Sequence, residues 1–228
     1  MAYDSVDPYT YPNSRVLKNR FGIKDKKQLE AIELKAYNTK VTTPTPKGKF
    51  DYPHLQNMHK HLFGEVYAWA GETREINLTK KTEYAGNTMF AMSHRIEPEI
   101  NKILSKLNQE DLHECSQNEL AYKFSEYFNE INAVHPFREG NGRTNRLFCS
   151  ELAKKYGYKI DWKYMNKEEY INASIKGTLE ADYRPMEKLI VQNISKIIPT
   201  HQIDLEQNHF DSLKSYQNAI SKKNTHKL

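Results

Sequence analysis

Twelve consecutive residues, 135 to 146, bring together a histidine, a carboxylate, glycines and arginines, and this density of functional groups suggests a site. Gly140 and Gly142 flank Asn141 at a point where a helix is expected to begin. Because glycine has no Cβ, backbone N–H groups can converge there on an anion, and the helix dipole adds positive charge. The glycines therefore predict a turn that binds phosphate.

The charged side chains of the same segment suit the rest of a phosphate-transfer site. Arg143 and Arg146 are three residues apart, so a helix places both on one face, from which they can donate charge-assisted hydrogen bonds to phosphates. Glu139 can hold Mg²⁺, because this ion binds carboxylate and phosphate oxygens together. His135 can accept a proton from a hydroxyl near neutral pH. Together these groups predict an in-line displacement at phosphorus.

Each of these features alone also has a simpler structural explanation. A histidine before a proline commonly packs or caps a helix, and a Gly-Asn-Gly triplet commonly makes a turn. Arginines on a helix commonly form surface ion pairs. We expect Phe137 to anchor the loop in the core. The order in which all the groups occur within one loop is what favours a catalytic function.

Two predicted helices hold this loop. Ser116 and Glu119 form a capping box ahead of apolar residues at helical spacing, so a helix is expected to run on to about Val134. It should end there because the next residue, His135, precedes a proline, and that position disfavours the α conformation. A second helix is expected to begin around Gly140.

The rest of the chain carries mainly helical signals, so the fold is predicted to be mainly α. Further helices are expected at 51–71, 93–107 and 166–180, and from Pro185 to Ile194. The segment 76–91 breaks the helical period and contains the turn formers Gly86 and Asn87, which predicts a β-hairpin. The last segment, 203–220, has apolar residues on one face and could pack on the core or join a further domain.

Composition limits the classes of function. A chain of 228 residues with 38% hydrophobic composition can bury one sizeable core. It has neither a run that approaches a membrane span nor a recognisable signal peptide at its start, so we expect a cytoplasmic protein with Cys115 and Cys149 reduced. The net charge of +5 suits an anionic partner. Because basic and aromatic stripes are missing, a nucleic-acid partner is not expected.

The segment HPFREGNGRTNR resembles the signature of Fic-domain proteins, H-x-F-x-(D/E)-G-N-G-R-x-x-R, with every specified position filled. The resemblance extends to four further stretches, which are Tyr67, Trp69, Ala70, Gly71 and Arg74; Phe90-Ala91; Ile160-Asp161-Trp162 with Tyr170 and Ala173; and Tyr11-Pro12-Asn13 with Val16-Leu17-Lys18-Asn19. The last stretch is similar to the opening of Fic domains in bacterial toxins and type IV secretion effectors. A Fic domain is therefore expected at 1–200, with a C-terminal helix or tail at 201–228.

The resemblance implies a helical Fic fold with a small β-hairpin flap, in an enzyme that transfers AMP from ATP to a Ser, Thr or Tyr hydroxyl of a target protein. It implies that His135 deprotonates the hydroxyl, that Glu139 coordinates Mg²⁺ and that pyrophosphate leaves. It assigns ATP binding to Gly140, Asn141, Gly142, Arg143 and Arg146. The alternatives are a Fic enzyme that transfers UMP, phosphocholine or phosphate, and a catalytically silent nucleotide-binding domain, against which the intact histidine argues.

In this family the flap pairs with an extended segment of the target, a form of β-augmentation. The expected target contacts are Lys80, Lys81, Glu83, Met89 and Phe90. For the three charged residues, ordinary solvated loop charges are the alternative explanation.

The sequence contains no copy of the family's inhibitory motif. Many family members carry an inhibitory S/T-x-x-x-E-G/N helix, but the only Glu followed by Gly or Asn here is Glu139 itself. The resemblance thus implies either a separate small antitoxin whose glutamate contacts Arg146, or constitutive activity. It leaves open whether the protein stays in the bacterial cytoplasm or is secreted into host cells as a type IV effector.

Overall fold

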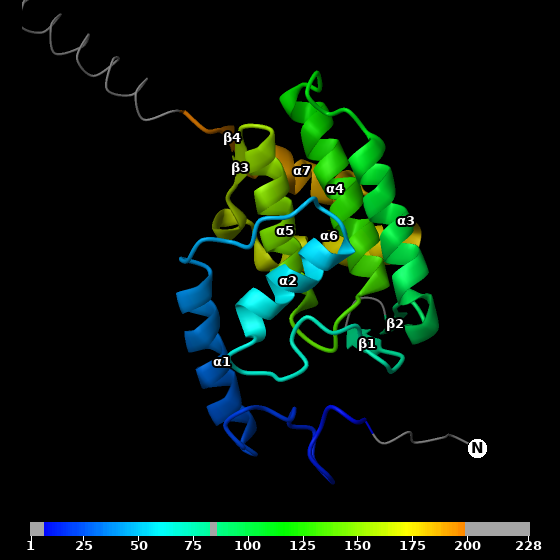
Figure 1. The fold of residues 1–228 in the computed structure, drawn as a ribbon. Coiled ribbons are helices and arrows are strands. Elements are labelled where there is room, and N and C mark those ends of the chain that lie inside the picture. Colours follow the sequence, from blue (N-terminus) through cyan, green and yellow to red (C-terminus); the bar gives the residue numbers. More distant parts are fainter. Residues whose placement is uncertain (1–6, 83–85, 199–228) are drawn as a thin grey trace, which may run out of the picture. The chain divides into compact units, whose positions relative to one another are not determined.

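The fold is built around α4 (Gln117–Val134), the helix that leads into the candidate loop (Figure 1). The capping box that the sequence predicts is present, because Ser116 and Glu119 each bond the backbone of the other. Apolar residues at helical spacing are buried along α4, among them Leu120, Phe124 and Phe128. The prediction of a mainly α fold is confirmed.

The computed structural model describes residues 7–82 and 86–198. Glu83 and the expected helix at 203–220 lie outside the described residues. The elements up to Ile194 form one compact unit, and a second unit begins at Ser195. Within the described ranges, no helix combines the length and apolarity needed to cross a membrane.

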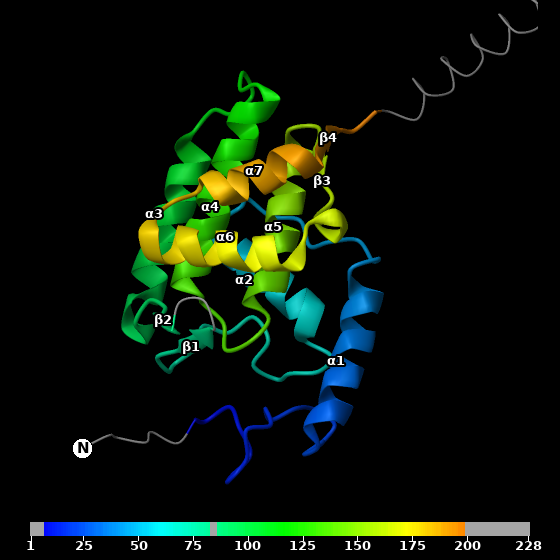
Figure 2. The ribbon, with the colours of Figure 1, turned by 180° about the vertical axis from the view of Figure 1, so that it is seen from behind.

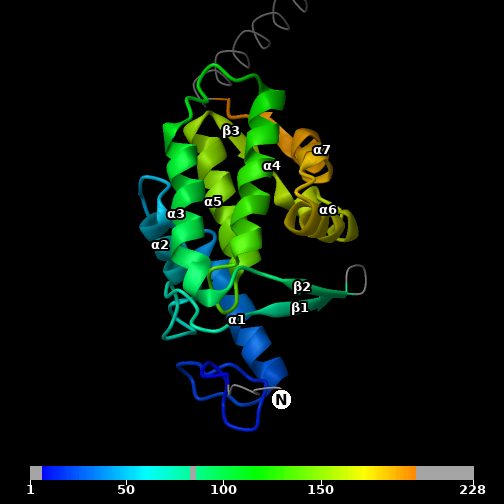
Figure 3. The same cartoon turned by 90° about the vertical axis from the view of Figure 1, so that its right-hand side faces the viewer.

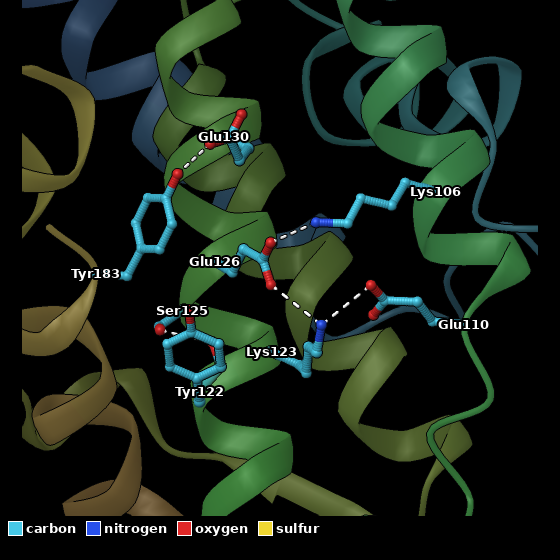
Figure 4. A network of polar contacts seen from close by, with 8 residues as sticks. All are labelled: Lys106, Glu110, Tyr122, Lys123, Ser125, Glu126, Glu130 and Tyr183. Atoms are coloured by element: carbon cyan, nitrogen blue, oxygen red, sulfur yellow. Dashed lines mark hydrogen bonds and ion pairs between the residues drawn. The ribbon is translucent and has the colours of Figure 1, made fainter. Parts of the chain in front are cut away.

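Helix α4 packs against α3 (Ile96–Gln109), α5 (Asn141–Lys155), α6 (Lys167–Glu180) and α7 (Arg184–Asn193). Figure 2 shows α6 and α7 crossing the face of α4 and α5. A polar network reinforces the packing: Glu126 of α4 bonds Lys106 of α3 at 2.6 Å and its own neighbour Lys123 at 3.3 Å, and Glu130 accepts from Tyr183 (Figure 4).

Helix α2 (Tyr52–Phe63) packs on α5 and ends earlier than predicted. Its start is as expected, since Asp51 accepts from the N–H of His54. The sequence predicted that it continues to Gly71, but Gly64 caps it. The prediction was wrong because Val66, Tyr67, Trp69 and Ala70 leave the helix to bury their side chains in a second core cluster with Leu62 and Phe63.

Helix α1 (Lys26–Lys40) was not predicted. Asp25 caps it by accepting from the N–H of Gln28, and it packs on α2. Leu29 is its one buried residue, so the apolar stripe that identifies a helix in a sequence is nearly absent. Three other short elements escaped prediction, which are the 3₁₀ turn η2 (Trp162–Tyr164) and the strands β3 (Tyr158–Ile160) and β4 (Ile194–Lys196).

The predicted hairpin is present as β1 (Thr79–Thr82) and β2 (Gly86–Met89), which pair antiparallel with Lys80 opposite Thr88. A 3₁₀ turn, η1 (Ser93–Arg95), leads from it into α3. In Figure 3 the hairpin lies at the end of the bundle where the loop joins α4 to α5. The fold therefore brings the two segments of chemical interest to the same end.

Candidate active site

His135 caps the C-terminus of α4 in the left-handed conformation, with φ 52°. Its Nδ1 lies 3.2 Å from the carbonyl oxygen of Asn132. A carbonyl only accepts, so Nδ1 carries the proton and Nε2 is left with a free lone pair. The imidazole is thus held in the tautomer that a general base needs.

The surroundings of this imidazole favour its neutral form. Burial lowers the pKa of His135 to about 3, with further lowering by the cations Lys80 and Arg74. The ring of Phe90, which follows β2, stacks on the imidazole with centroids 3.8 Å apart. His135 is therefore uncharged at neutral pH and is covered on one face by the hairpin.

The turn that follows uses its side chains in two ways. The side chain of Asn141 accepts from the N–H of Phe137 at 2.9 Å and donates to the same residue's carbonyl at 2.7 Å. Its side-chain oxygen and one of its two amide N–H groups therefore shape the loop, and its backbone N–H lies at the start of α5. Phe137 is 1% exposed, as the sequence predicted for an anchor.

Gly140 and Gly142 differ in the space that a side chain would meet. Gly140 has φ 82°, and a Cβ there would lie 2.5 Å from the ring of Phe63. Gly142 is helical, and the atom nearest to its added Cβ would be Nη1 of Arg146 at 3.9 Å. Packing therefore requires Gly140, whereas at Gly142 the space beside the chain is open for a ligand.

Helix α5 begins at this turn and presents its first amides and its arginines to the same space. The first N–H groups of a helix have no intrahelical acceptor. Arg143 pairs with Glu33 of α1 at 2.6 Å and lies over the ring of Phe63. Arg146 donates to the hydroxyl of Tyr170 at 3.1 Å. The cationic end of the site is therefore oriented by α1, α2 and α6 together.

Glu139 lies between the histidine and the helix. Its side chain is 46% exposed, its Oε1 accepts from the N–H of Gly140 at 2.9 Å, and Nη2 of Arg143 is 3.6 Å away. Its carbonyl accepts from Nε2 of His59, whose Nδ1 in turn accepts from the N–H of Gly71 at 2.8 Å. The backbone of Glu139 is therefore fixed while its carboxylate remains accessible.

One cavity of about 380 Å³ joins these groups. It is lined by most of the residues that the sequence singled out, namely His135, Glu139, Gly140, Gly142, Arg143, Arg146, Lys80 and Phe90. Met89 is 64% exposed and does not line it. Lys81 lies on β1, opposite Asn87. The volume is within the range of small-molecule sites.

Helix α6 supplies a wall of this cavity that no sequence pattern placed at the site. Tyr170, Ile171, Ser174, Ile175 and Thr178 line it. They recur at helical spacing, so a one-sided face was detectable, but nothing in the sequence placed this face beside residues 135–146. Its isoleucines and tyrosine ring form a surface against which a flat base can pack.

Comparison with protein families gives a match to the model of the Fic/DOC family over residues 49–153. Among curated proteins, the chain is 38% identical over 207 residues to the protein adenylyltransferase VbhT of Bartonella schoenbuchensis, covering 89% of this chain and 42% of that protein. It is 35% identical over 187 residues to the probable protein adenylyltransferase y4lH of Sinorhizobium fredii, covering 81% and 94%. The chain thus spans less than half of the first relative and nearly all of the second.

Comparison with solved structures also finds proteins of this kind. The Fic domain of a VirB-translocated Bep effector from Bartonella quintana, with bound ADP, matches with a TM-score of 0.71 and 31% identity over 83% of this chain and 95% of that one. BepC from Bartonella tribocorum, with bound AMPPNP, matches with a TM-score of 0.71 and 28% identity over 83% and 97%.

Proposed function

Because the chain belongs to the Fic/DOC family, we propose that it is a protein adenylyltransferase, which transfers AMP from ATP to a Ser, Thr or Tyr hydroxyl of a target protein and releases pyrophosphate. One observation carries the proposal. The free Nε2 of His135 and the amide-rich start of α5, with Arg143 and Arg146, share a single cavity.

In this proposal the nucleotide spans the two ends of this cavity. Its phosphates lie at the start of α5, where backbone amides, the helix dipole and the two arginines supply positive charge. Its adenine packs against the α6 residues, Ile171 and Ile175 among them. The related Bartonella structures with ADP and AMPPNP support a nucleotide at such a site.

Proton transfer and bond exchange then follow from the positions of the groups. The target hydroxyl gives its proton to Nε2 of His135 while its oxygen bonds to the α-phosphorus. The bond from the α-phosphorus to the bridging oxygen of the β-phosphate breaks, and pyrophosphate leaves with its negative charge held by Arg143 and Arg146. A bound triphosphate also raises the low pKa of His135, because nearby anions favour the imidazolium.

Glu139 fits a Mg²⁺ ion that the protein and the nucleotide bind together. Within the described residues there is no cluster of three or more His, Cys, Asp or Glu that could bind a metal without a substrate. Mg²⁺ commonly takes one or two carboxylates together with phosphates and water. The accessible carboxylate of Glu139 is such a ligand, and the ion would neutralise phosphate charge there.

The target docks at the flap in this proposal. Lys80 and Phe90 line the cavity from the hairpin, next to His135, so a segment laid along the hairpin brings a hydroxyl to the base. The proposal assigns selection of the target to Lys80, Lys81, Glu83 and Met89 of the segment 76–91.

An antitoxin is proposed to act at Arg146. Its described polar partners are tyrosines, with Tyr170 at 3.1 Å, so the guanidinium has no carboxylate among the described residues. Glu33 of α1 pairs with Arg143 instead. A glutamate brought by a separate small protein would compete there with ATP phosphates. We place the protein in the bacterial cytoplasm, with secretion through a type IV system as the alternative suggested by the VirB-translocated relatives.

Labelling with ATP tests the proposed activity. The intact chain and His135→Ala are incubated with ATP carrying a label on the α-phosphate, Mg²⁺ and lysates of bacterial and animal cells. A protein labelled only by the intact chain, with a mass gain of one AMP, supports the proposal and identifies the target's origin. A gain of UMP, phosphocholine or phosphate with the matching donor supports the other transferases. Equal labelling by both chains would remove His135 from its role.

A further inference from the structure

Arg74 is a buried charged residue that no step of the proposed reaction uses. It lies between α2 and β1 and is 1% exposed. Burial lowers its pKa, whereas the charges of Tyr52 and Tyr9 act to raise it. A buried cation is costly unless hydrogen bonds satisfy it. The groups that accept hydrogen bonds from Arg74 should therefore indicate its role.

Arg74 bonds three consecutive carbonyls around the histidine. Its Nε donates to the carbonyl of His135 at 2.8 Å, and its Nη2 donates to that of Val134 at 3.2 Å. Its own backbone N–H donates to the carbonyl of Pro136 at 2.9 Å. The backbone before, at and after His135 is thus held by one residue.

The same guanidinium holds both stems of the hairpin. Nη1 donates to the carbonyl of Ile76, which precedes β1, and Nη2 donates to that of Ala91, which follows β2, both at 2.5 Å. The N–H of Ala91 also donates to the carbonyl of Ala133 at the end of α4. Arg74 therefore connects the entry and exit of the flap to the catalytic loop.

Arginine is the side chain that can make this connection. All four side-chain acceptors are carbonyls, which need donors only, and the planar guanidinium presents five N–H groups in a fixed fork. Burial lowers the pKa of Arg74 to about 10, so it stays charged at neutral pH. A lysine has one compact ammonium and cannot reach acceptors spread over two segments.

Two features of the site depend on this connection. His135 holds a left-handed backbone conformation, which is strained for a residue other than glycine and persists where surrounding contacts impose it. Phe90, one residue before the anchored Ala91, stacks on the imidazole. We propose that Arg74 is a positioning residue for AMP transfer. It holds the His135 imidazole and the flap in a fixed position relative to each other.

This inference rests on the proposed function, but its test includes readouts that do not need activity. Arg74→Met and Arg74→Lys are compared with Leu104→Ala, a buried substitution in α3 that lowers stability without touching the site. Measured for each are ADP affinity, the rate of AMP transfer, thermal stability, amide exchange of Phe90 and Ala91, and the NMR titration of His135.

For Arg74→Met we expect ADP affinity close to that of the intact chain and a transfer rate lower by about 100-fold, as for a small misplacement of a catalytic group. The amides of Phe90 and Ala91 should exchange faster. The titration midpoint of His135 should rise, because the charged groups that face it are Lys80 and Arg74 and one cation is removed. Arg74→Lys should recover part of the rate, whereas Leu104→Ala should shift neither the exchange nor the titration.

The inference is overturned if Arg74→Met loses only the rate that Leu104→Ala loses and leaves exchange and titration unchanged. Should Arg74→Met fail to fold, the same comparison with Arg74→Lys decides. Absence of AMP transfer in the intact chain would remove the proposed function, whereas the exchange and titration experiments would still decide the role of Arg74.

Discussion

At the scale of single residues, the groups that face the cavity and the groups that hold them come from different parts of the chain. His135, Glu139 and the two motif arginines line one cavity, and their roles in catalysis and binding stay predictions. Asn141 was expected to bind ATP, but its side chain bonds the backbone of Phe137 within the loop. Its expected contribution to ATP binding is through its backbone N–H.

Residues that support the site are distant in sequence. Glu33 is 110 positions before its partner Arg143, and Arg74 is 61 before His135. Tyr170 is 24 beyond Arg146. A pattern read along the chain shows which residue types are present but not which of them meet. Only the fold could supply these partners.

Replacing Lys80 should change the titration of the base. The cation of Lys80 disfavours the imidazolium, so Lys80→Met should raise the pKa of His135, which burial keeps below its ordinary value of about 6.5. An NMR titration of the nucleotide-free chain measures the midpoint, with Lys154→Met, on the far part of α5, as control. An unchanged midpoint in Lys80→Met would show that the lysine does not act on the base.

Replacing Glu139 should remove the part of the activity that needs metal. Glu139→Gln keeps the shape of the side chain but loses the charge that holds Mg²⁺, so transfer should fall by about 100-fold or more. ADP binding measured with a chelator should stay close to that of the intact chain. Glu99→Gln, on α3, is the control. Wild-type Mg²⁺ dependence in Glu139→Gln would contradict the assignment.

At the scale of elements, local signals placed helices where capping and burial agree. α4 has both a capping box and a buried stripe and was predicted well. α1 buries only Leu29, so its pattern gave no signal, although it delivers Glu33 to the site. α2 ends early because burial of the residues after Phe63 outweighs helix continuation. Tertiary burial, which the sequence does not display, decided these differences.

Two alanine substitutions should separate packing from binding at the start of α5. Gly140→Ala puts a side chain at φ 82° and against Phe63, so the free energy of unfolding should fall by about 2 kcal/mol or more. Gly142→Ala enters open space on a helix, so stability should be unchanged or slightly higher, while the methyl group obstructs the phosphates. Urea unfolding and ADP titration measure both quantities. Equal losses of stability would contradict the distinction.

At the scale of the whole molecule, elements from most of the chain form the site. α4 ends at His135 and α5 starts beyond it, while α6 supplies the apolar wall and the hairpin covers the histidine. The polar network of α3, α4 and the residue before α7 fixes the middle and the C-terminal part of α4, which leads to His135 (Figure 4). A ligand that bridges α5 and α6 therefore acts on the stability of the unit as a whole.

ATP should raise the melting temperature through Arg146. A ligand that binds only the folded chain stabilises it by about 2.7 kcal/mol at 100 times its dissociation constant. For a chain of this size, that corresponds to a rise of about 5 to 10 °C. Arg146→Met should lose most of this rise, because the guanidinium binds phosphates in the cavity, while Arg184→Met, whose arginine is exposed beside Asp182, should keep it. Thermal unfolding with and without ATP and Mg²⁺ measures both. If ATP raised the melting temperature of Arg146→Met as much as that of the intact chain, the nucleotide would bind elsewhere. Arg146 lies at the end of the cavity to which the proposal assigns the phosphates.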